Sequence, residues 1–147
     1  MPCVIVQPPA ATAFTPSGMY KNGSTQSAGS SSSQITGWVA DTAAFPGSTV
    51  SSDGLVVQAA SDDATVTANI AFSGTFSGTW TVRLYLNGAQ IAQGPGVNAS
   101  SGTATAEATG VTVAPGDVVT VRISTTSSFG SQVSAGSGTW VHVVAAA

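Results

Sequence analysis

Residues 80–91 read WTVRLYLNGAQI, and apolar side chains alternate with polar ones up to an Asn-Gly pair. An alternation with a period of two is typical of a β-strand that is buried on one face only. Asn and Gly tolerate the positive φ angles that both central positions of a type I′ turn require, so Asn87-Gly88 predicts a hairpin. A two-residue loop places Leu84 opposite Ile91, and both then lie on the apolar face of the hairpin.

The same alternation recurs along the rest of the chain, and no stretch has the period of an amphipathic helix. Shorter apolar runs surround Trp38 and Leu55, and residues 114–117 (Ala-Pro-Gly-Asp) suit a type II turn. About eight short strands separated by turn residues indicate an all-β protein, an antiparallel β-sandwich of the jelly-roll type. The alternating stretches are residues 65–72, 80–86, 103–113, 118–124 and 139–144.

Residues 1–34 differ in composition from the remainder. Four prolines interrupt any long regular element, and residues 23–33 consist mainly of Ser and Gly, as in a flexible linker. We therefore expect an extended N-terminal arm at residues 1–34 that docks on a partner or a neighbouring subunit. The β-sandwich is then expected to occupy residues 35–147.

Charged residues are scarce: the chain has three Lys or Arg, six Asp or Glu and one His, for a net charge of −3 at pH 7. Three cations cannot neutralise a nucleic-acid backbone, and a negative net charge disfavours anionic membranes, so we expect neither partner. General acid–base catalysis needs titratable groups, which are almost absent, so we expect no enzymatic activity, no cofactor and no bound metal. Cys3 is the single cysteine, which excludes a disulfide within the chain.

Five side chains are candidate contacts for a partner or a ligand. Tyr85 and Arg83 lie on the polar face of the strand before the Asn-Gly pair, and so face away from the core. Phe129 lies in a Ser/Gly-rich loop, either as an anchor of that loop or as a contact at its tip. Trp140 and His142 share one side of the last strand, and a single His without catalytic or metal-binding partners suggests an interface or structural role. Aromatic faces also stack on sugar rings, so a carbohydrate platform is the alternative.

Three features of residues 35–147 occur in one order: a strand that ends in Asn87-Gly88, a Gly116-Asp117 pair before a strand, and a short apolar last strand at 138–144 (GTWVHVV). This order resembles the C1q/TNF-like jelly roll, especially the form found in virion proteins of tailed phages of actinobacteria, among them minor tail proteins and head decorations. The resemblance implies a homotrimer with the first and last strands near the threefold axis, and it carries no catalytic residues.

We therefore expect a non-enzymatic structural virion protein of a tailed bacteriophage, a minor tail or tail-tip protein. Its N-terminal arm is expected to dock on other virion proteins, while the jelly roll projects as a trimer and contacts the host surface. The expected location is the virion, assembled in the host cytoplasm and extracellular in the mature particle. The alternatives are a capsid decoration or head protein of the same type of phage, and a carbohydrate-binding module for bacterial surface glycans.

Overall fold

The alternating stretches form antiparallel strands, as the sequence predicts, but two of these strands are longer than expected: residues 65–72 and 80–86 belong to one continuous strand of 26 residues, and the strand expected at 103–113 already begins at Val97. The computed structural model describes residues 13–146, and within them no helix is long and apolar enough to cross a membrane. The strands of this part of the chain are β1 (Ser17–Lys21), β2 (Gln26–Ser27), β3 (Ser33–Gln34), β4 (Trp38–Ala40), β5 (Thr49–Ser51), β6 (Gly54–Val56), β7 (Ser61–Leu86), β8 (Ala89–Gln93), β9 (Val97–Val113), β10 (Val118–Thr125), β11 (Gln132–Val133) and β12 (Gly136–Ala145).

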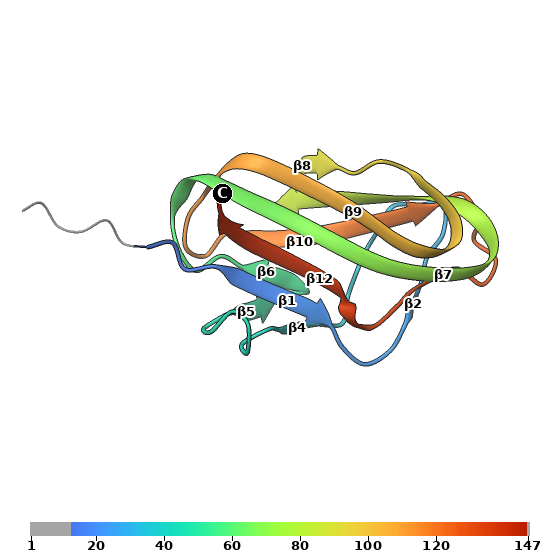
Figure 1. Ribbon diagram of the computed structural model, residues 1–147, viewed down its shortest axis with the longest axis horizontal. Coiled ribbons are helices and arrows are strands. Elements are labelled where there is room, and N and C mark those ends of the chain that lie inside the picture. The colour runs from blue at the N-terminus through green and yellow to red at the C-terminus, as the bar shows by residue number, and fades with distance from the viewer. Residues whose placement is uncertain (1–12, 147) are drawn as a thin grey trace, which may run out of the picture.

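Strand β7 runs the length of the molecule, bends, and returns in a second layer (Figure 1). Its first half pairs with β12 and β9, which places it in a first layer of order β4-β1-β12-β7-β9. Its second half pairs with β10 and β8, in a second layer of order β5-β6-β10-β7-β8. The register shifts between Ser73 and Gly78, where the strand turns the corner. A Cβ on Gly78 would lie 2.8 Å from Thr125 and Ser127 atoms, so the bend needs a residue without a side chain.

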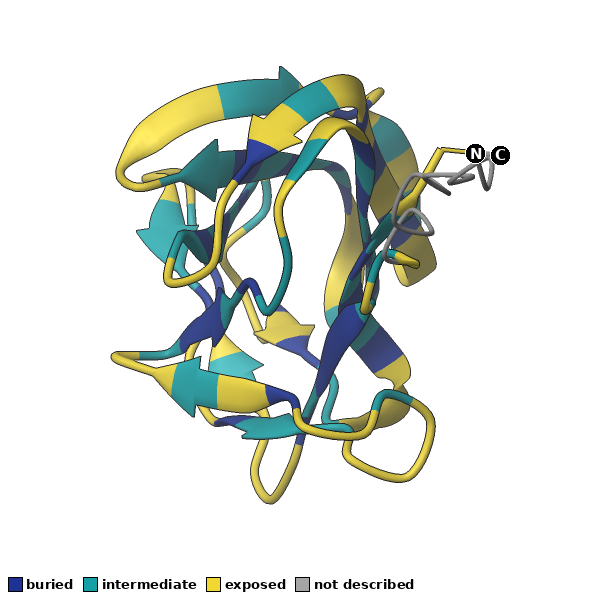
Figure 2. Cartoon of the chain, turned by 90° about the vertical axis from the view of Figure 1, so that its left-hand side faces the viewer, coloured by how far each residue is buried: buried dark blue, intermediate teal, exposed yellow. Residues whose placement is uncertain are grey.

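The hydrophobic core lies between the two layers and consists of the apolar residues of each alternation. Ile70, Trp80, Leu84, Val121 and Val143 have no exposed surface. Buried residues accordingly lie along the strands, where they alternate with intermediate and exposed ones, and the turns are largely exposed (Figure 2). The protein is an all-β antiparallel sandwich with jelly-roll topology, in agreement with the fold class that the alternation predicts.

The Asn-Gly hairpin forms, but its register differs from the predicted one. Asn87 and Gly88 have φ angles of 51° and 84°, as a type I′ turn requires. Beyond the first two pairs the register shifts, so that Leu84 lies opposite Ala92 rather than Ile91. The predicted pairing of Leu84 with Ile91 is therefore wrong, because a β-bulge adds one residue to β8.

The segment before residue 35 is part of the sandwich and corrects the predicted domain boundary. Strand β1 lies between β12 and β4 in the first layer, and its Met19 is fully buried. Strands β2 and β3 pair with β11 and β10. Main-chain pairing needs no apolar side chains, which is why the Ser/Gly composition concealed these strands. Residues 1–12, with Cys3, lie outside the described residues, and docking of the N-terminal segment remains a prediction for them alone.

Replacement of Trp80 by Ala tests the packing between the layers. The Trp80 indole stacks on Phe72 with ring centroids 4.2 Å apart and donates a hydrogen bond to the Ala99 carbonyl over 3.1 Å. We expect Trp80→Ala to lower the free energy of unfolding by about 3–5 kcal/mol, measured by urea denaturation. Phe129→Ala, which removes a ring that is 67% exposed, is the control and should change it by about 0.5 kcal/mol or less. Equal losses in the two variants would contradict this account of the core.

Candidate functional site

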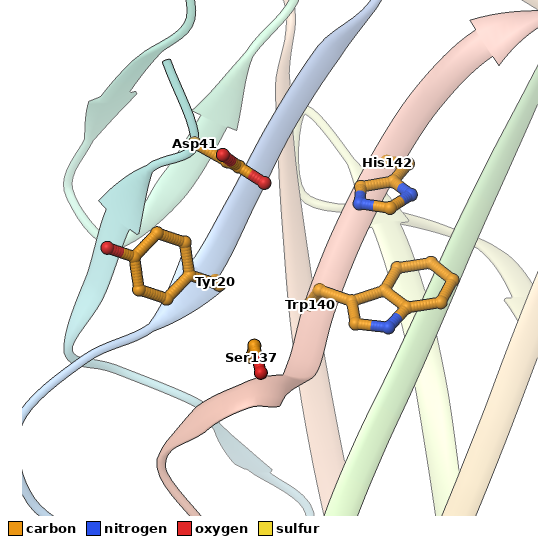
Figure 3. A pocket seen from close by; sticks show the side chains of 5 residues that line it. All are labelled: Tyr20, Asp41, Ser137, Trp140 and His142. Atoms are coloured by element: carbon orange, nitrogen blue, oxygen red, sulfur yellow. The ribbon is translucent and has the colours of Figure 1, made fainter. Parts of the chain in front are cut away.

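An open hollow lies on the outer face of the first layer, over β1 and β12. Its volume is about 340 Å³, and Figure 3 shows the five side chains that line it: Tyr20, Asp41, Ser137, Trp140 and His142. Strand β12 directs Trp140 and His142 outward because Val141 and Val143 alternate with them and are buried in the core. The two outward residues that sequence analysis predicted for the last strand therefore lie in one site.

Three aromatic rings lie in contact along this face, and two of them are stacked. The Trp140 indole and the His142 imidazole lie nearly parallel, 14° apart, with ring centroids separated by 4.0 Å. Phe45 lies against His142 at a centroid distance of 4.5 Å. Gly18 lies opposite His142 on β1, and a Cβ at Gly18 would collide with the Phe45 ring. The glycine therefore creates the space in which the ring of Phe45 reaches the stack.

Burial among these rings lowers the pKa of His142 from its usual value of 6.5. The Asp41 carboxylate opposes this shift because it favours the charged imidazolium, but its effect is smaller than that of burial. The imidazole is therefore neutral at pH 7, and the stack presents aromatic surface rather than a positive charge.

The hollow contains the three residue types of a Ser-His-Asp triad without the arrangement of one. Within residues 13–146, no hydrogen bond joins His142 to Ser137 or to Asp41, whereas a triad needs the nucleophile, base and acid linked in series. The Asp41 Oδ1 atom instead accepts a hydrogen bond from the Ala44 amide over 3.2 Å. The described residues also contain no group of three or more His, Cys, Asp or Glu side chains that could hold a metal ion.

Arg83 and Tyr85 lie together on the outer face of the second layer, on the opposite side of the sandwich from the hollow. Arg83 donates from Nε to Gln93 Oε1 and from Nη1 to Ser124 Oγ, each over 3.0 Å. Arg122 lies over the Tyr85 ring, with 5.3 Å between its guanidinium carbon and the ring centroid. Sequence analysis missed Arg122, although its place on the polar side of the 118–124 alternation was the signal that could have found it.

Phe129 lies apart from both faces. It is 67% exposed and contacts Phe76, which is 58% exposed, at a ring-centroid distance of 5.6 Å. Phe76 belongs to the bend of β7, so this pair marks one end of the sandwich. The five predicted contact residues thus divide among three places. Three residues of the hollow were not predicted from the sequence. Tyr20 belongs to the segment that was expected to be an arm, Asp41 lies at the end of the strand expected around Trp38, and Ser137 lies in an expected loop.

Comparison with known proteins bears on the fold. No protein-family model matches the chain, and no curated protein matches it. The solved structure of Eiger TNF from S. frugiperda superimposes with a TM-score of 0.66 over 92% of this chain and 94% of that chain, at 13% sequence identity. The chain has a TNF-like jelly-roll fold. Residues 35–147 make up about three quarters of the sequence, whereas the superposition covers 92% of it. The superposition therefore includes residues before 35, so the N-terminal strands belong to this fold.

The lowered pKa of His142 predicts a pH dependence of stability. The unfolded chain binds the proton more tightly than the folded chain, so folding is stabilised above pH 6.5 and loses that contribution as the pH falls below 6.5. We expect the wild-type protein to lose more stability between pH 7.5 and pH 5 than His142→Gln, measured by urea denaturation at both values. The same loss of stability in both proteins would show that His142 does not contribute to the pH dependence of stability.

Proposed function

We propose that the chain is a non-enzymatic structural protein that assembles as a homotrimer through the outer face of β4, β1 and β12. The observation that carries this proposal is the outward aromatic cluster of Trp140, His142 and Phe45 beside an open hollow. Aromatic side chains are enriched at the centres of protein interfaces, where they exclude water. A second copy of the chain is the occupant that this face suits best.

The charge distribution of the face supports association with like copies. Among residues 13–146, Asp41 is the one acid that lines the hollow, and His142 is neutral at pH 7 because burial lowers its pKa. Burying an unpaired charge is costly, and a face with few charges avoids most of that cost. The resemblance of the sequence to C1q/TNF-like jelly rolls also implies subunit contacts at the first and last strands.

We further propose that the trimer is part of the virion of a tailed bacteriophage, at the tail or tail tip. The resemblance of residues 35–147 to phage virion proteins supports this location, as do the scarce charges of the chain. Residues 1–12 would then dock on other virion proteins, and the jelly roll would project and contact the host surface. Decoration of the capsid is the alternative location, and the position of the protein in the particle distinguishes the two.

The oligomeric state tests the proposed interface. We expect multi-angle light scattering at micromolar concentration to give three times the chain mass of 14.4 kDa. Ser137→Arg, which puts a long cation at the exposed rim of the hollow, should give a folded monomer. Gln90→Arg, a matched change on exposed β8 of the second layer, should leave the trimer intact. A monomeric wild-type protein would overturn the proposed interface. The reverse pattern, in which Ser137→Arg remains a trimer and Gln90→Arg becomes a monomer, would also overturn it.

Removal of the first twelve residues tests the proposed attachment to the particle. A chain of residues 13–147 retains β1 and every later strand, so it should fold and form the trimer. We expect it to be missing from assembled particles, as measured by mass spectrometry of purified virions against particles with the full chain. Incorporation at the full level would show that attachment resides in the jelly roll. A shortened chain that fails to fold would instead mean that residues 1–12 contribute to stability.

A further inference from the structure

A row of four long polar side chains crosses the outer face of the second layer. Gln34 of β3 lies opposite Arg122 of β10, Arg122 opposite Arg83 of β7, and Arg83 opposite Gln93 of β8. Adjacent strands are about 4.8 Å apart, so the row spans about 14 Å across four strands. Tyr85 flanks the row, next to Arg83 on β7 and beneath the guanidinium of Arg122.

The two arginines at the centre of the row are like charges in direct cross-strand register. Such a pair destabilises a sheet, because side chains directly opposite each other are within about 5.5 Å at Cβ. The chain has only three Lys or Arg residues, and two of them occupy this pair. Their contacts are neutral: Arg83 donates to Gln93 and Ser124, and Arg122 stacks on Tyr85. Eight of the ten guanidinium N–H donors of the pair therefore have no hydrogen-bond partner among residues 13–146.

Two acids that directly precede β10 and β6, Asp117 and Asp53, accept hydrogen bonds from groups outside the row. Asp117 lies before β10 and accepts hydrogen bonds from Asn87 Nδ2 over 3.0 Å and from the Ala114 amide over 2.9 Å. Asp53 accepts from the Gly37 amide over 2.9 Å, and its charge acts on Lys21, where it raises the pKa against the effect of burial. Neither carboxylate neutralises the arginine pair, so the row presents a local positive charge on a protein of negative net charge.

We propose that this row binds an acidic glycan, a polysaccharide whose sugar rings carry carboxylate groups. The planar fork of a guanidinium matches a carboxylate with two parallel hydrogen bonds, and an anion between Arg83 and Arg122 replaces their mutual repulsion by attraction. The inference deepens the host-surface contact of the proposed function and rests on it for its biological setting. It places that contact on the second layer, away from the proposed subunit interface.

The groups around the arginines favour a sugar over another anion. The side-chain amides of Gln34, Gln93 and Gln90 each combine a donor with an acceptor, as ring hydroxyls do. Each amide keeps one of these groups for a ligand: Gln34 donates to the Ser52 and Asp53 carbonyls, Gln93 accepts from Arg83, and Gln90 accepts from the Tyr85 hydroxyl over 3.3 Å. The ring of Tyr85 supplies apolar surface beside the charges. A row about 14 Å long suits a few consecutive sugar units, whereas two cations are too few to follow a nucleic-acid backbone.

Titration calorimetry of the full chain with oligogalacturonate tests the site. We expect binding that weakens as salt is added, and no binding of the fully methyl-esterified, neutral oligosaccharide. Arg122→Gln should weaken binding by about tenfold or more, because it removes a charge-assisted contact. The Arg122→Gln/Ser77→Arg double variant restores the net charge at an exposed position of the β7 bend and should bind as weakly as Arg122→Gln. Recovery of binding in the double variant would reduce the effect to overall charge and overturn the site.

A thermal melt separates a ligand site from a structural role. Arg122→Gln relieves the cross-strand repulsion, so without ligand its melting temperature should equal or exceed that of the wild type. A fall of several degrees would assign Arg122 a structural role and overturn the proposal.

Binding of poly(glycerol phosphate) or single-stranded DNA in place of oligogalacturonate would also overturn it, since the ligand would then not be an acidic sugar. Light scattering on the same samples distinguishes the two proposals. If the protein is a trimer but does not bind the oligosaccharide, only the glycan site is refuted. If it is a monomer that binds the oligosaccharide, only the assembly is refuted.

Discussion

Both layers of the sandwich depend on one continuous strand. Strand β7 contributes its first half to the first layer and its second half to the second layer, and β9 follows it through most of its length. The alternation of side chains continues on each side of the bend, so Ile70 and Trp80 both face the core although they belong to different layers. The bend itself depends on close contact of Gly78 with Thr125 and Ser127. Every other strand is placed by pairing, directly or through a neighbour, with one half of β7.

This arrangement gives the molecule two outer faces of different chemistry. The first layer presents aromatic rings beside the hollow, with Trp140 stacked on His142 and Phe45 tilted against His142. The second layer presents Arg83 and Arg122 in register, flanked by amides. The two faces point in opposite directions, so association through one leaves the other open to solvent. Assembly and ligand binding are therefore compatible functions for one small domain, each on its own face.

The sequence predicts the features that depend on residues close together in the chain, and it does not predict those that depend on residues far apart. The strand alternations and the Asn87-Gly88 turn depend on neighbouring residues, and their buried faces were predicted correctly. The register of β8 depends on a bulge, which depends on packing rather than on the turn residues. Strand β1 was missed because its hydrogen bonds join it to β12 and β4, and its five residues (SGMYK) are too few to show an alternation of apolar and polar side chains.

The candidate sites also combine features that the sequence predicts with features that only the tertiary structure shows. By itself, the sequence determined which side chains point outward, because alternation along a strand assigns each residue to one face. It therefore identified Arg83, Tyr85, Trp140 and His142 as outward residues. Only the tertiary structure decided which outward residues meet: Phe45 reaches His142 over Gly18, and Arg122 lies opposite Arg83. Those contacts join residues far apart in the chain, and their positions follow from strand order and register, which local patterns do not encode.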